Sequence, residues 1–175
     1  MLLGICGSLR AEATNRKLMH EAARLYGGEF AEGSIRMPLY DGDLEKADGV
    51  PAEAQALADQ ILSAEAVLVA TPEYNQSFSG SLKNALDWVS RVPGGVWKKK
   101  PVALLSAAAG RAGGARAQYA LRLAMTPFQP RLMTGPEVLL ASAAKQFDEG
   151  GRLTDERTLK ALTELMENLR EAAGS

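Results

Sequence analysis

The chain has 175 residues, of which 46% are apolar and 23% are charged, and its formal net charge is −1. This size and composition are typical of a globular domain, so we expect residues 1–175 to form a single domain without a disordered tail. No apolar run approaches the roughly 18 residues that a membrane span needs, and we expect no export signal. One cysteine and one histidine argue against a disulfide framework and a metal site. We therefore expect a cytoplasmic protein with no nucleic acid or membrane partner.

Short apolar runs alternate with longer amphipathic segments along the whole chain. Runs that are apolar on both faces are typical of parallel strands covered by helices, whereas apolar residues three and four apart indicate helices. The predicted strands are residues 2–6, 34–39, 66–70, 101–105 and 138–140. The predicted helices are residues 15–26, 51–63, 81–92, 115–125 and 154–173. Thr14 and Thr154 are the expected N-caps of two helices, and residues 38–50 are expected to form a surface loop.

This alternation predicts an α/β fold, a three-layer sandwich in which helices cover both faces of a five-stranded parallel sheet. In such sheets, ligands bind beyond the carboxyl ends of the strands, where the strand order reverses. The loops after Cys6, Ala70 and Leu105 are therefore the candidate binding region.

The loop after Cys6 leads from a strand into the start of a helix, where free backbone N–H groups and the helix dipole favour an anion. Ser8 and Asn15 add short polar side chains, and Arg10 adds a planar guanidinium that matches phosphate oxygens. These residues favour a phosphate site, although a capped turn with polar surface residues has the same ingredients.

Three better-known phosphate sites do not match this loop. The fingerprints G-x-x-x-x-G-K-[ST] and G-x-G-x-x-G are absent. A cysteine phosphatase of the low-molecular-weight type needs an arginine six residues after its nucleophile, but Glu12 stands at that distance from Cys6. Because the charge of Glu12 would repel a phosphoester, Cys6 is expected to be a small core residue.

The other two loops offer aromatic and main-chain surfaces. After Ala70, Tyr74 is able to cover a flat ring, and backbone groups near Glu73 and Asn75 are able to pair with the edge of that ring. The loop after Leu105 has almost no side chains, so its amides are able to approach a ligand closely. A phosphate site beside these two loops fits flavin mononucleotide (FMN), although ordinary turns would also produce each loop.

Several motifs follow one another in order along almost the whole chain. They are Gly7-Ser8-Leu9-Arg10 with Asn15-Arg16, Pro38-Leu39-Tyr40-Asp41, Thr71-Pro72-Glu73-Tyr74-Asn75 through Leu82-Lys83-Asn84-Ala85-Leu86-Asp87-Trp88, Lys100-Pro101-Val102 and Gly113-Gly114-Ala115-Arg116. In these motifs the chain resembles the NADPH-dependent FMN reductase family, a flavodoxin-like group that includes quinone, chromate and azo-dye reductases.

The resemblance implies a flavodoxin-like sheet with the strand order 2-1-3-4-5 that carries FMN. It implies that the FMN phosphate is held by Ser8, Arg10 and Asn15. It implies that the flavin ring is lined by Pro72, Glu73, Tyr74 and Asn75, with its pyrimidine side near Ser106 and Gly110. Family members commonly form homodimers or homotetramers, with the helix that contains Asp87 and Trp88 near the subunit contact.

The chain departs from the family pattern in its loops. Ala13 stands where a serine is frequent, and Gln76 replaces a frequent glycine. Ser79-Gly80 replaces Pro-Gly, and residues 107–109 are alanines where the family has more hydroxyl groups. Contacts made by the backbone survive these changes, and an FMN affinity lower than typical is expected.

The implied activity is that of an NAD(P)H-dependent FMN oxidoreductase. A hydride passes from NADPH or NADH to flavin N5, and electrons then pass, with ping-pong kinetics, to a quinone-like or similarly broad small-molecule acceptor. The flavin carries this chemistry, so no catalytic side chain and no metal are expected. Arg111 and Arg116 are either contacts for the extra phosphate of NADPH or scattered surface arginines. A flavodoxin-type electron carrier and a flavin-binding regulatory module stay open as alternatives, although carriers usually have a strongly acidic surface.

Overall fold

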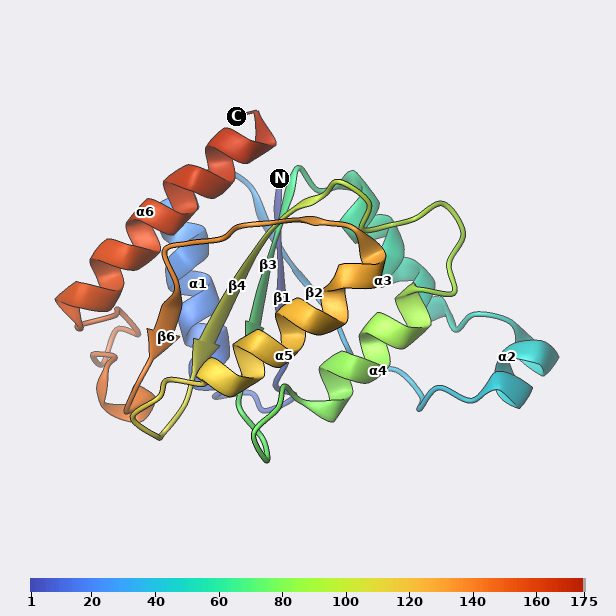
Figure 1. The fold of residues 1–175 in the computed structure, drawn as a ribbon, viewed down its shortest axis with the longest axis horizontal. Coiled ribbons are helices and arrows are strands. Elements are labelled where there is room, and N and C mark those ends of the chain that lie inside the picture. The colour runs from blue at the N-terminus through green and yellow to red at the C-terminus, as the bar shows by residue number, and fades with distance from the viewer. Residues whose placement is uncertain (175) are drawn as a thin grey trace.

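A computed structural model describes residues 1–174, which form one parallel sheet with helices on both faces (Figure 1). The strands are β1 (Leu2–Cys6), β2 (Phe30–Gly33), β3 (Ala66–Thr71), β4 (Pro101–Ala107), β5 (Arg131–Leu132) and β6 (Val138–Leu140). Hydrogen-bonded neighbours follow the order β2-β1-β3-β4-β5, and β6 also pairs with β4. All pairs are parallel. The predicted flavodoxin-like α/β fold is confirmed.

Two short strands fill the fifth position of the sheet. β5 pairs with the start of β4, at Pro101 and Val102, whereas β6 pairs with the end of β4, from Leu105 to Ala107. The segment 133–137 between them contains Pro136, which has no N–H to donate to a neighbouring strand. The strand predicted at residues 138–140 is confirmed as β6, and β5 is an addition that periodicity did not indicate.

Each face of the sheet is covered because alternate strand residues point to opposite sides and both sets are apolar. On one face pack α1 (Thr14–Tyr26) and α6 (Glu156–Ala173), which lie together in Figure 1. On the other face pack α3 (Ala52–Ser63), α4 (Gly80–Val89) and α5 (Ala115–Met125). Among residues 1–174, no helix has both the length and the apolar character that crossing a membrane requires.

The strand predicted at residues 34–39 is wrong, because β2 occupies Phe30–Gly33. Gly27 ends α1, and the chain rejoins the sheet at once, with Leu2 N donating to Glu29 O at 2.8 Å. Gly33 leaves room for Leu57, since a Cβ at position 33 would lie 2.7 Å from Leu57 Cδ1 and would force that side chain to move. Because β2 contains polar and small residues, the pattern of apolar residues did not predict a strand there.

One additional helix and two N-cap residues also differ from prediction. The predicted loop at residues 38–50 contains α2 (Gly42–Asp48), which is capped by the Asp41 carboxylate accepting from Asp43 N at 2.8 Å. The N-cap of α1 is Ala13 and not Thr14, and it provides no side-chain hydrogen bond. The N-cap of α6 is Asp155 and not Thr154. Short 3₁₀ turns, η1 (Thr126–Phe128) and η2 (Ala143–Lys145), complete the connections.

Gly4 in β1 lies tightly against α1 and β2. A Cβ at this position would lie 2.7 Å from both Met19 Sδ and Phe30 Cε2. We expect Gly4→Ala to lower the free energy of unfolding by about 1–3 kcal/mol, because the core would be overpacked. Urea denaturation measures the change. Gly80→Ala, where no atom lies within 4 Å of the added carbon, is the control and should not be destabilised. Equal losses in the two variants would contradict the packing argument.

Glu21 couples α1 to the turn before α6. Its carboxylate accepts from Arg24 Nη2 at 2.6 Å and from Arg152 Nη1 at 3.4 Å, and these cations hold the pKa of Glu21 below its ordinary 4.5. A carboxyl group with a lowered folded-state pKa stabilises the protein above its unfolded pKa, and this contribution is lost as the pH falls through the folded value. We therefore expect the stability of Glu21→Gln to fall less steeply than that of the wild type below about pH 4.5. Urea midpoints measured over an acid pH series check this, and parallel curves would refute it.

Candidate functional site

The carboxyl ends of β1, β3 and β4 lie side by side at one edge of the sheet. Their pairing places Cys6 beside Ala70 and Thr71 beside Ser106. Three loops leave this edge: loop A (residues 7–13), loop B (residues 72–79) and loop C (residues 108–114). Because β2 and β3 flank β1 on opposite sides, the strand order reverses here, where parallel sheets bind ligands. The fold thus brings the three predicted loops to one place.

Loop A presents unused hydrogen-bond donors at the start of α1. Its last residue, Ala13, provides no capping side chain, and the first turn of α1 contains no acidic residue. Within residues 1–174, the N–H groups of Ala11, Glu12 and Ala13 donate to no protein acceptor. The Ser8 side chain is buried, and its Oγ accepts from Arg10 N over a long 3.4 Å. Free donors at the positive end of a helix favour an anion.

Asn15 joins the start of α1 to the end of β4. Its Nδ2 donates to Ala107 O at 2.8 Å, and its Oδ1 accepts from Ala107 N at 2.9 Å. The carboxamide is buried, so this pair of bonds replaces hydrogen bonds that water would otherwise make. The structure therefore places Asn15 between loops A and C, and gives it a bracing contact that the sequence did not indicate.

Loop B closes on itself as a tight hairpin. Tyr74 N donates to Ser77 O at 2.9 Å, and Ser77 N donates to Tyr74 O at 3.1 Å. The two residues between them, Asn75 and Gln76, have φ values of 49° and 66°, as in a type I′ turn. This conformation explains why glycine suits position 76 better than glutamine. The hairpin leaves the side chain of Tyr74 half exposed at the strand edge.

Ser79 connects loop B to loop A. Its Oγ accepts from Leu82 N at 3.2 Å as the N-cap of α4, and it donates to Gly7 O. A proline in this position would have no hydroxyl for either bond, so the Ser79-Gly80 departure adds a link between the loops. Sequence analysis missed this role, although a serine directly before a helix is an N-cap signal.

Glu73 lies between loop B and α5. Its Oε1 is 3.8 Å from Arg116 Nη1, whereas its Oε2 is buried and has no hydrogen-bond partner within residues 1–174. Arg116 therefore lies beside a predicted ring contact. Arg111, in the middle of loop C, is exposed and makes no hydrogen bond or ion pair within the described residues. The buried oxygen of Glu73 is an acceptor that a ligand N–H can satisfy.

Loop C folds back against the sheet. Ser106 Oγ donates to Gly113 O at 2.8 Å and accepts from Gln118 Nε2 at 3.4 Å, so this side chain holds the loop. Gly113 has a φ of 58°, and a Cβ there would lie 2.4 Å from the backbone of Leu139. Only glycine fits that close approach. Gly110 is exposed at the tip, with nothing within 4 Å of an added Cβ.

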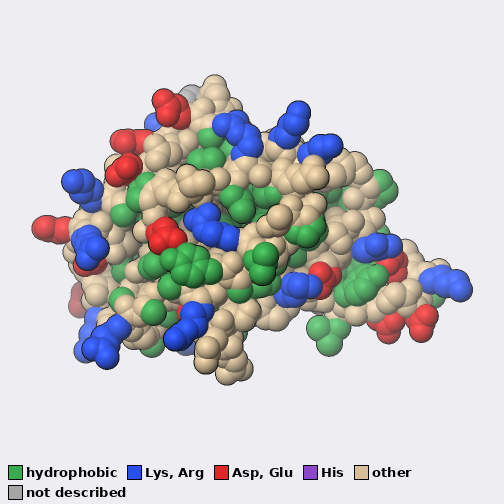
Figure 2. Space-filling view, in the orientation of Figure 1, with side chains coloured by type: hydrophobic (Ala, Val, Ile, Leu, Met, Phe, Trp, Pro, Cys, Tyr) green, Lys and Arg blue, Asp and Glu red, His purple; other side chains and the backbone are tan. Residues whose placement is uncertain are grey.

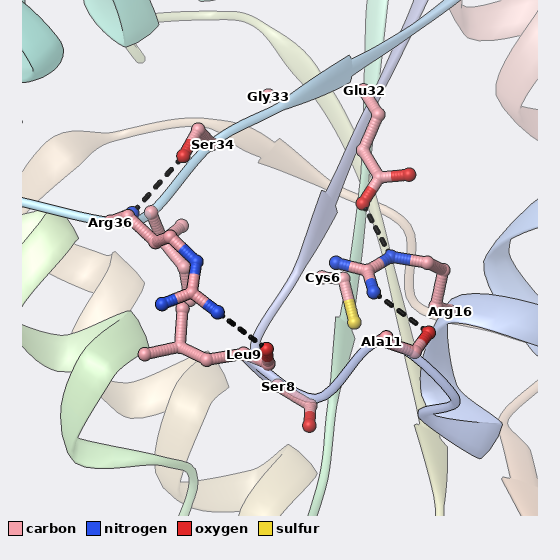
Figure 3. A pocket seen from close by; sticks show the side chains of 10 residues that line it. Cys6, Ser8, Leu9, Ala11, Arg16, Glu32, Gly33, Ser34 and Arg36 are labelled. Carbon is pink, nitrogen blue, oxygen red and sulfur yellow. Dashed lines mark hydrogen bonds and ion pairs between the residues drawn. The ribbon is translucent and has the colours of Figure 1, made fainter.

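A cavity of about 440 Å³ lies between loop A and the end of β2 (Figure 3). Arg16 and Glu32 border it on one side and Arg36 on the other. The Cys6 thiol also lines it, and burial raises the pKa of that thiol, which disfavours the reactive thiolate. No residue of loop B or loop C lines this cavity, so it is separate from the crevice expected for a flavin ring.

Comparisons with known proteins show which family this chain resembles. Residues 1–145 match the family described as NADPH-dependent FMN reductase. The chain is 41% identical to NAD(P)H-dependent FMN reductase PA1204 of Pseudomonas aeruginosa, over 96% of this chain and 92% of that protein. It is also 41% identical to a quinone reductase of Escherichia coli, over 91% of this chain and 87% of that protein.

A solved structure shows a similar fold. It is FerB, a flavoenzyme NAD(P)H:(acceptor) oxidoreductase from Paracoccus denitrificans, with a TM-score of 0.88 and 35% sequence identity. The similarity covers 99% of this chain and 96% of that chain.

Removing the Asn15 carboxamide should disconnect the helix start from β4. We expect Asn15→Ala to lower the free energy of unfolding by about 2–4 kcal/mol, because Ala107 N–H and C=O are left buried and unpaired. Asn15→Asp keeps the acceptor for Ala107 N–H but, when ionised, sets a negative charge against Ala107 O. Its stability deficit should therefore grow as the pH rises. Urea denaturation without added ligand measures both, and a deficit in Asn15→Asp that does not change with pH would refute this assignment.

Proposed function

The chain belongs to the NADPH-dependent FMN reductase family. From that membership we propose that FMN binds where loops A, B and C meet and that it passes electrons to a quinone-like acceptor. The chain is an FMN-dependent NAD(P)H oxidoreductase. A non-catalytic electron carrier is not favoured, because the relatives are named as enzymes. The face shown in Figure 2 also intersperses basic and acidic side chains and has no single acidic docking surface.

The start of α1 is the observation that supports the FMN site most directly. It offers loop N–H groups that have no acceptor among residues 1–174, in front of a helix with no acidic residue in its first turn. A phosphate with two negative charges would satisfy those donors and interact favourably with the helix dipole. We propose that Ser8 and Arg10 contact this phosphate and that Asn15 keeps the helix start in register with β4. Ala13 contributes its backbone only.

Loops B and C suit a flat ring with polar edges. We propose that Pro72, Glu73, Tyr74 and Asn75 line the ring. Glu73 Oε2 has no hydrogen-bond donor in the part of the chain that the structure describes, and it would accept from a ring N–H. Ser106 acts indirectly, because its hydroxyl holds loop C at Gly113 while the main chain near Gly110 faces the pyrimidine side.

When bound, FMN supplies the atom that accepts a hydride and stores the electrons for the second substrate. The residues of the chain have to hold the ring and leave one face open to NAD(P)H and the acceptor in turn. The half-exposed Tyr74 is proposed to border that face. Arg116 is 3.8 Å from Glu73, so we propose the exposed Arg111 as the contact for the extra phosphate of NADPH.

We also propose a homodimer or homotetramer in the cytoplasm. Trp88 is fully buried, donates from Nε1 to Pro38 O at 2.8 Å and packs edge-on against Tyr40. It therefore cannot itself contact a second subunit, but it supports the neighbouring Leu39, which is 82% exposed. Light scattering gives the subunit number directly. The proposed cytoplasmic location is supported by the single cysteine, which is free and buried as is common in a reducing compartment.

The activity is tested with purified protein, FMN and each nicotinamide cofactor under anaerobic conditions. We expect the protein to bind FMN, and we expect NADPH or NADH to bleach the yellow colour of the oxidised flavin. A quinone should then restore the colour without any partner protein. Binding of FMN without bleaching by either cofactor would favour a carrier or regulatory module. Failure to bind FMN would refute the proposed site.

A further inference from the structure

Two arginines hold the backbone of loop A from outside the proposed phosphate site. Arg36 Nη2 donates to Leu9 O at 2.8 Å. Arg16 Nη1 donates to Arg10 O at 2.8 Å and to Ala11 O at 3.0 Å. Consecutive carbonyl groups of the loop therefore point toward these guanidinium groups. Figure 3 shows the two arginines on either side of the cavity next to the loop.

The direction of these carbonyl groups determines the direction of the amide donors. In a trans peptide, the C=O of one residue and the N–H of the next point to opposite sides. Carbonyl groups turned toward the arginines therefore turn the N–H groups of Arg10, Ala11 and Glu12 away from them. Arg10 N reaches Ser8 Oγ, a proposed phosphate contact, and Ala11 N and Glu12 N have no protein acceptor within residues 1–174.

The guanidinium of Arg16 is anchored by an ion pair, and the backbone of Arg36 by a hydrogen bond. Arg16 Nε donates to Glu32 Oε1 at 2.7 Å, and Glu32 lies in β2 opposite Gly4 of β1. The other oxygen of Glu32 lies 3.1 Å from His20 Nε2, which fixes the carboxylate from a second side. The hydrogen bond between Arg16 and Glu32 raises the pKa of Arg16, so the guanidinium stays charged. On the other side of the cavity, the backbone N–H of Arg36 donates to Ser34 Oγ at 3.2 Å.

We propose that Arg16 and Arg36 are positioning residues that aim the amides of loop A at the FMN phosphate. The inference rests on the proposed function but concerns residues outside the cofactor contacts. Arg16 donates from Nε to Glu32 and from Nη1 to carbonyl groups of loop A. It therefore acts on the phosphate through the backbone of loop A and not by direct contact. Because Ala13 gives no hydroxyl here, backbone donors bear more of the phosphate binding, and their orientation matters more.

The experiment compares affinities for FMN and for riboflavin, which has the same ring but no phosphate, by flavin fluorescence titration. We expect Arg16→Gln to weaken FMN binding about 10-fold, as expected from loss of a charge-assisted contact, and to leave riboflavin binding unchanged. Arg36→Gln should also weaken FMN binding and leave riboflavin binding unchanged. Because Arg36 is exposed, we expect this variant to fold normally. Arg24→Gln removes another ion pair from α1 and should change neither affinity.

Arg16→Lys separates orientation from charge, because lysine keeps the charge but loses the planar fork that reaches Glu32 and both carbonyl groups. We expect it to bind FMN nearly as weakly as Arg16→Gln. Restoration of wild-type affinity by lysine would overturn the positioning role in favour of simple charge attraction. Wild-type FMN affinity in Arg16→Gln, or an equal loss for both flavins, would also overturn it. A wild-type protein that binds neither flavin would instead refute the proposed function itself.

Discussion

The double hydrogen bond between Asn15 and the backbone of Ala107 is the contact on which the arrangement of the site depends. It links a helix start to a strand end 92 residues later in the chain. A parallel sheet aligns strand ends but leaves the loops beyond them free to diverge. Asn15 fixes loop A relative to loop C, and the hydroxyl of Ser79, donating to Gly7 O, fixes loop B relative to loop A. Contacts within the protein therefore hold the three loops together as one surface.

On this surface, polar side chains mainly hold the loops in place, whereas backbone groups are left to bind a ligand. Side chains that a sequence reader would assign to the ligand, such as Asn15 and Ser106, bind the protein's own main chain. The groups left over are amides of loop A and a buried oxygen of Glu73. Main-chain donors do not depend on the side chain, so they are present in loop A although this chain has alanine at position 13. Preorganised donors also avoid the entropic cost of ordering a loop on binding.

The layout of the fold was predictable because buried parallel strands are apolar on both faces, as in β3 and β4. β2 was misplaced because Glu32 and Gly33 break that pattern while serving contacts with Arg16 and Leu57. The loops were identified from their position after strands. Their internal links were not, because a contact such as Asn15 to Ala107 joins segments that only the folded sheet brings together. Likewise, no spacing rule shows that Arg16 reaches back to loop carbonyls.

The interrupted fifth position of the sheet has a consequence for behaviour at high concentration. A long, continuous outer strand offers a template on which another molecule can add its own strand, the first step of β-aggregation. Here that outer border consists of a two-residue and a three-residue piece, separated by a segment that contains a proline. Too few adjacent backbone groups remain in line to recruit a foreign strand, so this rim resists fibre growth although the strands behind it are strongly apolar.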